Sequence, residues 1–456
     1  MNKLNIKTMR KKLLFTALLL VFFQLSYSQG FSLRKCIDYA QKNSSTIKNA
    51  QFDVAISEHK VQEQIGSMLP QIDASGSYKD NIKLPTTALP GELMGGEPGT
   101  TVLISMGTKH NASGGLSLNQ KVFNPATSIA IKTARINKQQ SEQTLQQTEE
   151  LLVYNVCITY YETLVVQKQT NALKATLDAS TESLASTELK YKNGMAQRVD
   201  VDKIKVSYNN TRSSLQQSEL SYKQSLNNLK YYIGMPVDSV ITLSDTTLTM
   251  DLSPEMISVD SFNVKNHIDY KLQQTTLSLN QANKKKEAAG YLPTLSFNAS
   301  YDYNAMRNKF NFFDNDQKWL NSYNFSFTLS IPVFDGLQRK NRISQSKLEI
   351  NKAQENIWQT TQSLKVNLSN YEIEYRNAID NIRNEKDNLD LAQSVYENTK
   401  LAYKMGTQSS LELVQAESSY REAQSNYFNK LLNLYIARVA LEKSKGKLNE
   451  YVNNIK

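Results

Sequence analysis

Residue types that build catalytic and metal sites are scarce in this sequence of 456 residues, which has two cysteines and three histidines. The histidines, His59, His110 and His267, are too widely spaced to form a metal-binding cluster. The sequence also lacks a Gly-x-Ser-x-Gly elbow, a phosphate-binding loop and a paired-cysteine motif. We therefore expect no enzyme activity, no metal and no cofactor.

Long apolar runs are equally scarce, since the mean hydropathy is −0.50 and no stretch after the N-terminus approaches the length of a transmembrane helix. The one clear apolar run covers residues 13–23, and the small residues Ser26 and Ser28 follow it. Five cations precede it: Lys3, Lys7, Arg10, Lys11 and Lys12. This order is typical of a secretory signal peptide, which we place at residues 1–28. A transmembrane anchor is the alternative, but the run is shorter than the roughly 20 residues that a spanning helix needs.

Basic residues only slightly outnumber acidic ones once the signal peptide is left out of the count. The formal net charge is +10, but without those five cations 48 basic residues face 43 acidic ones. Much of the excess of basic residues therefore lies in the signal peptide, and we expect no nucleic-acid partner. Export permits a disulfide, but Cys36 and Cys157 lie far apart in the sequence. We interpret them as separate packing residues, with a disulfide between them as the alternative.

The chain contains two related halves, which indicates an internal duplication. The stretch "YKNGMAQRVDV" at Tyr191 returns 212 residues later as "YKMGTQSSLEL" at Tyr403. Pro70 in "GSMLPQIDASGSY" matches Pro293 in "GYLPTLSFNASY", 223 residues later, and "LSLNQKVFNP" matches "FTLSIPVFDG" after 211 residues. The differing offsets place a longer loop between the paired segments of the first half.

Strands are predicted where polar and apolar residues alternate, in hairpins over about 71–123 and 294–334. The apolar face of the second hairpin comprises Leu295, Phe297, Ala299, Tyr301, Tyr303, Tyr323, Phe325, Phe327, Leu329 and Ile331. The first hairpin repeats it more weakly with Ile72, Ala74, Gly76, Tyr78, Ala112, Gly114, Leu116 and Leu118. Such alternation over roughly 9–11 residues suits a transmembrane β-strand, with a soluble sandwich as the alternative.

Four such strands are too few for a closed barrel, which needs at least about 8. Open sheet edges in lipid leave backbone groups unpaired at a cost of several kcal/mol each. Other copies of the chain are therefore expected to complete the sheet. Two copies would give about 8 strands and a filled interior, whereas three would give about 12 and room for a channel.

Two long helices are predicted over 126–191 and 337–403, where neither proline nor glycine occurs. About 66 residues of helix span about 100 Å. Apolar residues recur every seven positions in the second helix, at Ile343, Ile350, Ile357, Leu364, Tyr371 and Ala378, and at Leu368, Tyr375, Ile382, Leu389, Tyr396 and Tyr403. The first helix has a looser series, with Val153, Tyr160, Leu177, Leu184 and Tyr191. An apolar residue at every seventh position over several repeats predicts a coiled coil. A coiled-coil dimer or filament is the alternative, but the predicted strand hairpins fit a filament poorly.

The repeated tyrosine-lysine-x-glycine motif is interpreted as the tip of a helical hairpin, at 191–200 and again at 403–412. Gly194 and Gly406 supply the backbone freedom of a helix end. Asp200 and Glu412 fall in the first turns of the returning helix, where an acid suits the positive end of the helix dipole. Both tips are therefore expected to lie about 100 Å from the strands.

Together these segments resemble the TolC family of outer-membrane efflux proteins. The resemblance rests on both tip motifs and on "YYIGMP", "GYLPTLSFNASY" and "LSIPVFDG", and it covers nearly the whole mature chain. It implies a homotrimer with a 12-stranded β-barrel in outer-membrane lipid and a helical tunnel in the periplasm. It also implies a periplasmic adaptor and an inner-membrane pump as partners, in efflux or type I secretion of small molecules, ions or polypeptides. A barrel-anchored surface scaffold or adhesin without transport is the alternative.

Site residues follow from the same resemblance, because the tips of family members close the tunnel and carry acidic rings. The expected gate comprises Glu412, Asp200, Gln408 and Gln415; Gln415 stands where a second acid is often found and Gln408 where a base sometimes occurs. The alternative for both acids is charge compensation at a helix start. The expected adaptor contacts are Gly194, Met195, Gly406 and Thr407, with a plain helix-ending turn as the alternative.

The fold class expected is thus mainly α, with a transmembrane β-barrel and an internally duplicated chain. After the signal peptide, the first repeat covers 29–235, a linker expected to form an equatorial collar covers 236–261, the second repeat covers 262–448 and a tail covers 449–456.

Overall fold

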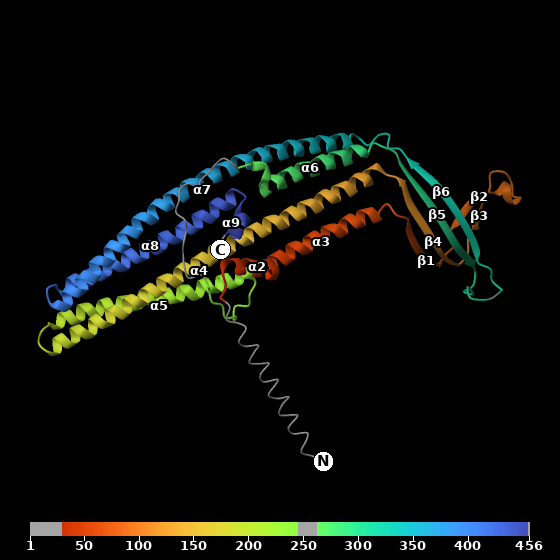
Figure 1. Ribbon diagram of the computed structural model, residues 1–456. Coiled ribbons are helices and arrows are strands. Elements are labelled where there is room, and N and C mark those ends of the chain that lie inside the picture. Colours follow the sequence, from red (N-terminus) through yellow and green to blue (C-terminus); the bar gives the residue numbers. More distant parts are fainter. Residues whose placement is uncertain (1–29, 245–261, 315, 455–456) are drawn as a thin grey trace, which may run out of the picture. The chain divides into compact units, whose positions relative to one another are not determined.

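The computed structural model describes residues 30–244, 262–314 and 316–454 (Figure 1). The predicted signal peptide, most of the predicted linker and the end of the tail lie outside these residues. The chain divides into two compact units. Unit 1 is Met1–Asp53, Glu142–Gln273 and Asn356–Lys456, and unit 2 is Val54–Ser141 and Gln274–Glu355.

Helices make up most of the described chain. They are α2 (Leu33–Asn43), α3 (Ser45–Gly66), α4 (Pro125–Lys192), α5 (Arg198–Ile233), α6 (Ile268–Ala289), α7 (Gln338–Met405), α8 (Ser410–Ser444) and α9 (Leu448–Asn454), with short 3-10 turns at Gly91–Met94 and Val264–Asn266. The two longest, α4 and α7, have 68 residues each; α7 contains neither proline nor glycine, and α4 has Pro125 as its first residue and no other proline or glycine. Within the described part of the chain, no helix is both long and apolar enough to cross a membrane.

The strands belong to unit 2 and form a four-stranded antiparallel sheet in the order β1 (Gln71–Asp80), β4 (His110–Phe123), β5 (Thr294–Arg307) and β6 (Leu320–Ser330). The central pair, β4 and β5, joins the two halves of the duplication. The strands pair so that Ile72 lies beside Leu118, Leu118 beside Ala299, and Ala299 beside Phe325. Because residues opposite one another share a face, the apolar faces predicted for the two hairpins form one continuous surface.

Aromatic residues strengthen the apolar face by pairing across β5 and β6. Tyr301 stacks on Tyr323 with ring centroids 5.8 Å apart, and Phe297 lies 5.1 Å from Phe327. Such pairs stabilise neighbouring strands by roughly 0.2–1 kcal/mol each. The outermost aromatic side chains nevertheless remain uncovered, since Phe325 is 74% exposed.

Polar side chains link the strands on the opposite face. The Asn119 amide donates to Asn298 Oδ1 at 2.6 Å, and the Asn298 amide donates to Thr328 Oγ1 at 3.3 Å. A serine pair, Ser77 and Ser113, bonds across β1 and β4 at 2.7 Å. The sheet is therefore amphipathic, with one apolar face and one hydrogen-bonded polar face.

A second, two-stranded ribbon stands where the sequence predicts only a longer loop. It consists of β2 (Thr86–Pro90) and β3 (Thr101–Ser105), which pair antiparallel between β1 and β4 in the sequence. Each strand has only five residues, and Pro90 ends the first of them. Segments this short carry too little alternation to separate a strand from a loop.

Burial on α7 follows one of the two predicted series, in which Leu368, Tyr375, Ile382, Tyr396 and Tyr403 are buried and Leu389 is half-buried. In the other series only Leu364 and Ala378 are buried. The looser series on α4 is buried at Val153 and Tyr160, and Leu184 packs half-buried against a hydrophobic cluster near the turn. The series is wrong at Tyr191, which is exposed, and Leu177 is only half-buried. The buried positions there are instead Thr176, Ser180, Ser183 and Thr187. Three of these hydroxyls, on Thr176, Ser183 and Thr187, donate to the carbonyl four residues earlier, which lowers the cost of burying them.

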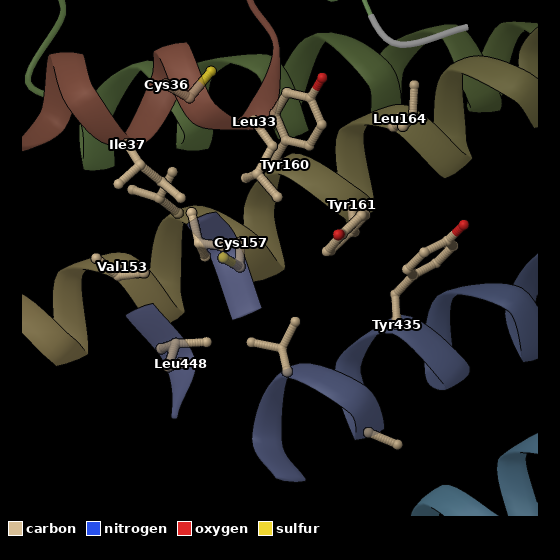
Figure 2. Close-up of a cluster of buried hydrophobic side chains, with 14 of the residues drawn as sticks. Leu33, Cys36, Ile37, Val153, Cys157, Tyr160, Tyr161, Leu164, Tyr435 and Leu448 are labelled. Atoms are coloured by element: carbon tan, nitrogen blue, oxygen red, sulfur yellow. The ribbon is translucent and has the colours of Figure 1, made fainter. Parts of the chain in front are cut away.

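A compact hydrophobic core lies in unit 1, where α2, α4, α8 and α9 contribute residues such as Leu33, Tyr160, Tyr435 and Leu448 (Figure 2). Cys36 and Cys157 belong to this core, and the structure places neither in a disulfide. They are thus separate packing residues rather than a disulfide. Burial raises the pKa of the Cys157 thiol to about 12, which makes it unreactive in the folded protein.

Candidate functional site at the tips of the helical hairpins

Both tips of unit 1 are tight turns in which a glycine takes the left-handed backbone conformation. Gly194 has φ +74° between α4 and α5, and Gly406 has φ +83° between α7 and α8. In each turn the next residue closes the helix: Met195 N–H donates to Lys190 O at 2.8 Å, and Thr407 N–H donates to Ala402 O at 2.9 Å. The two motifs therefore form the same helix-ending turn twice.

The two acids of the tips each cap a helix. Glu412 accepts hydrogen bonds from the backbone N–H and the hydroxyl of Ser409, both at 2.8 Å. Asp200 accepts from the Gln197 backbone N–H at 3.1 Å. Both arrangements are capping boxes, which satisfy backbone groups at the helix start. The bonds from the Ser409 backbone and side chain lower the pKa of Glu412, so this carboxylate stays ionised at neutral pH.

Other predicted tip residues surround these caps. The Gln408 amide, turned to its hydrogen-bonding orientation, donates to the Glu412 carboxylate at 2.8 Å. Gln415 is exposed on α8, and Met195 is 72% exposed at the turn. Thr407 Oγ1 donates to Ala402 O at 3.0 Å and belongs to the turn itself. Of these residues, only Gln408 therefore lies against the Glu412 carboxylate.

Asp200 also connects one tip to the other. Its carboxylate accepts from Ser410 Oγ at 2.6 Å, so a residue at the start of α5 binds one at the start of α8. This bond is the main reason why the pKa of Asp200 is lowered. The predicted gate residues Asp200 and Glu412 therefore differ: both cap their own helix, but only Asp200 bonds to the other hairpin.

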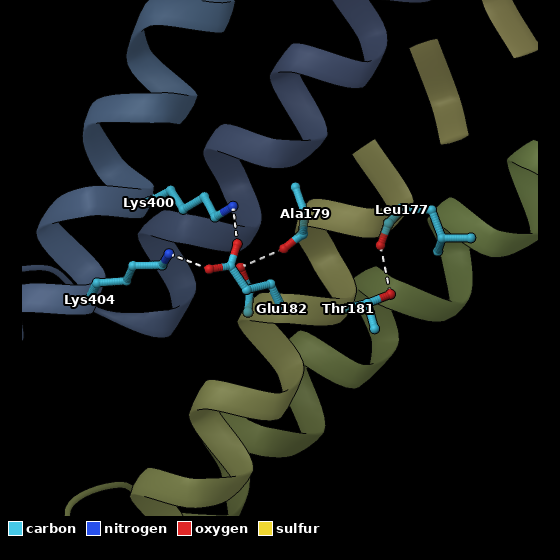
Figure 3. Close-up of polar contacts among 7 residues, drawn as sticks. Leu177, Ala179, Thr181, Glu182, Lys400 and Lys404 are labelled. Carbon is cyan, nitrogen blue, oxygen red and sulfur yellow. Dashed lines mark hydrogen bonds and ion pairs between the residues drawn. The ribbon is translucent and has the colours of Figure 1, made fainter. Parts of the chain in front are cut away.

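A second connection between the hairpins is a set of contacts from α4 to α7 that the sequence did not indicate. Figure 3 shows Glu182 of α4 between Lys400 and Lys404 of α7, with oxygen–nitrogen distances of 2.9 and 2.6 Å. We call Glu182, Lys400 and Lys404 the tip clamp. Hydrogen bonds from Lys404 and Lys400 lower the pKa of Glu182 to about 2.

Two further contacts between α4 and α7 reinforce the tip clamp. On α4 they lie between Glu182 and the end of the helix. Thr187 and Tyr403 share a hydrogen bond of 2.8 Å between their hydroxyls. Lys190 Nζ donates to Tyr403 O at 2.9 Å and lies 4.6 Å from the centre of the Tyr403 ring. The only sequence signal for this meeting was Tyr403, the last member of its seven-residue series, because a buried seam residue must contact a neighbouring helix.

Comparison with known proteins identifies the family. Residues 36–235 and 267–447 match the family described as "Outer membrane efflux protein". The chain is 19% identical to "Outer membrane protein TolC" of Vibrio cholerae serotype O1 over 347 residues, which cover 74% of this chain and 77% of that protein.

Two solved structures share the fold. The outer membrane protein VceC of Vibrio cholerae superposes with a TM-score of 0.69 at 13% identity, over 91% of this chain and 96% of VceC. The CmeC outer membrane channel of Campylobacter jejuni gives a TM-score of 0.69 at 15% identity, over 93% of this chain and 90% of CmeC. The predicted fold class is thereby confirmed, and the family is one of efflux proteins rather than enzymes. The chain belongs to the outer membrane efflux protein family, whose members lie in the outer membrane with a helical tunnel in the periplasm.

Proposed function

We propose that three copies of this chain form a channel through the outer membrane, which serves as the exit duct of an efflux or type I secretion system. The observation that carries the proposal is the open amphipathic sheet. Its edge strands, β1 and β6, end a sheet of four strands whose apolar face is uncovered. Lipid would cover that face, and pairing of β1 with β6 of the next copy would satisfy both edges and give a barrel of about 12 strands.

Edge pairing between copies is tested by cysteine cross-linking. We expect a cysteine at Ser75 on β1 to cross-link to one of a series of cysteines at Asn324, Ser326 or Thr328 on β6, giving covalent trimers in denaturing gels. The native cysteines are buried and provide a low background. Purified trimers should conduct ions in planar bilayers. Monomeric, non-conducting protein would contradict the proposal, and a cross-linked trimer that never conducts would favour a scaffold.

We also propose that Glu412 sets the charge of the channel entrance, where three copies would surround one axis. Its side chain is exposed, although Ser409 holds the carboxylate in the capping box. Glu412→Gln tests the charge separately from the fold, because glutamine is also accepted at this position of a capping box. We expect Glu412→Gln to reduce cation over anion selectivity in bilayer recordings. Glu422→Gln is the matched control, because it removes the same charge from an exposed position of α8 outside the tip and should leave selectivity unchanged. Equal selectivity of Glu412→Gln and wild type would remove Glu412 from the entrance.

The outer surface of the turns is proposed to contact a periplasmic adaptor that links the channel to an inner-membrane pump. Gly194, Met195, Gly406 and Thr407 make up these turns, and a Cβ at either glycine would meet nothing within 4 Å. A photo-cross-linker at position 195 or 407 should capture a co-expressed adaptor. Assembled pumps without such cross-links would place the contact elsewhere.

A further inference from the structure

A half-open cavity lies in unit 1, between α4, α5 and α8. Its volume is about 520 Å³, and most of its lining residues are serine and glutamine. Among its described lining residues, Arg421 of α8 carries the only charge. The cavity is distinct from the turns and the tip clamp, and no residue of the predicted gate lines it.

Arg421 has no ionic partner among the described residues, and its Nε is shielded from solvent without a hydrogen bond. The acid one turn before it on α8, Glu417, is itself buried and accepts from Thr211 Oγ1 at 2.9 Å. Arg438, further along α8, shows the usual arrangement, because it pairs with Glu442 at 3.0 Å. A guanidinium left unpaired in a cavity is the natural partner of a carboxylate or another oxyanion.

Gln424 of α8 contributes a buried acceptor to the same cavity. Its side chain is 5% exposed, and its Oε1 has no hydrogen-bond partner in the described part of the chain. The Gln424 carbonyl oxygen is therefore a buried acceptor without a donor among the described residues. A buried polar group in this state favours a ligand that can donate to it.

The serine hydroxyls of the cavity add further acceptors. Ser221 Oγ donates to Gln217 O at 3.1 Å, and Ser214 Oγ donates to Asn210 O at 3.0 Å. A hydroxyl that donates its proton to the backbone keeps its oxygen lone pairs free to accept. The lining therefore combines one cation with several hydrogen-bond acceptors.

We propose that this cavity binds a small solute that carries one carboxylate together with several hydroxyl groups. The carboxylate pairs with the Arg421 guanidinium, and the hydroxyl groups donate to Gln424 Oε1 and to the serine oxygens. An anion with acceptors only, such as sulfate, would leave those oxygens unpaired, and a neutral polyol would leave Arg421 unpaired. The proposal does not depend on channel activity.

The test is calorimetric titration of the purified full-length protein in detergent with D-gluconate, sulfate and sorbitol. Gluconate should bind saturably, and sulfate and sorbitol at least about tenfold more weakly, which corresponds to about 1.4 kcal/mol. Arg421→Gln should weaken gluconate binding by about tenfold or more, because it removes the charge-assisted hydrogen bonds to the carboxylate.

Arg212→Gln is the matched control, because it removes the same charge from an exposed position of α5 and should leave gluconate binding unchanged. Arg421→Lys keeps the positive charge but lacks the two parallel N–H donors of a guanidinium, so it should bind gluconate with intermediate affinity. The proposal is overturned if gluconate gives no saturable heat, if sulfate or sorbitol binds equally well, or if Arg421→Gln binds like wild type.

Discussion

Replacing Gly234 by alanine should destabilise unit 1 by about 3 kcal/mol or more. Gly234 ends α5 with φ +73°, a backbone conformation that costs residues with a side chain roughly 1–2 kcal/mol. A Cβ there would also lie 2.8 Å from the carbonyl carbon and oxygen of Asn43 and 2.9 Å from the Ser44 nitrogen. These are backbone atoms at the junction of α2 and α3, so no side chain can turn away to relieve the contact.

Gly446→Ala separates the two causes, because Gly446 has φ +70° but a Cβ there would meet nothing within 4 Å. We expect Gly446→Ala to cost about 1–2 kcal/mol, from backbone strain alone. The measurement is the midpoint at which each purified variant loses its helical circular dichroism signal on heating. Equal midpoints for the two variants would show that the contact with Asn43 and Ser44 does not limit stability.

The strand faces and the turns could be predicted because each depends on local chemistry. An alternating strand fixes which side chains share a face, and Leu118 and Ala299 do lie side by side on the predicted surface. A glycine that ends a helix needs no distant partner, so Gly194 and Gly406 could be placed from their motifs alone.

The tip clamp could not be predicted because it depends on the relative rotation of two helices. Glu182 and Lys400 are 218 positions apart, and many other acids and lysines on α4 and α7 could have met instead. The prediction of the buried positions on α4 was partly wrong for a related reason. Threonine and serine are usually surface residues, yet Thr187 is fully buried because its hydroxyl bonds to Ser183 O and Tyr403.

Reversing the charge of both clamp lysines, in Lys400→Glu/Lys404→Glu, should open the channel and raise its conductance several-fold. In the wild type each lysine attracts Glu182, whereas in the variant three carboxylates would face one another between α4 and α7. Like charges at this separation repel, so the hairpins should part at their tips. Lys386→Glu is the matched control, because Lys386 pairs with Asp390 on its own helix and does not join the hairpins.

Acid should act on the same contact in the wild type. The pKa of Glu182 falls from an ordinary 4.5 to about 2 on folding, so the clamp stabilises the contact between α4 and α7 fully above about pH 4.5 and loses that effect as the pH falls towards 2. Conductance should therefore be constant between about pH 8 and 5 and rise on further acidification. Glu182→Gln should conduct more at neutral pH and lack the acid response. Unchanged conductance of the doubly reversed variant, with folding and assembly like those of the wild type, would show that the tip clamp does not hold the channel closed.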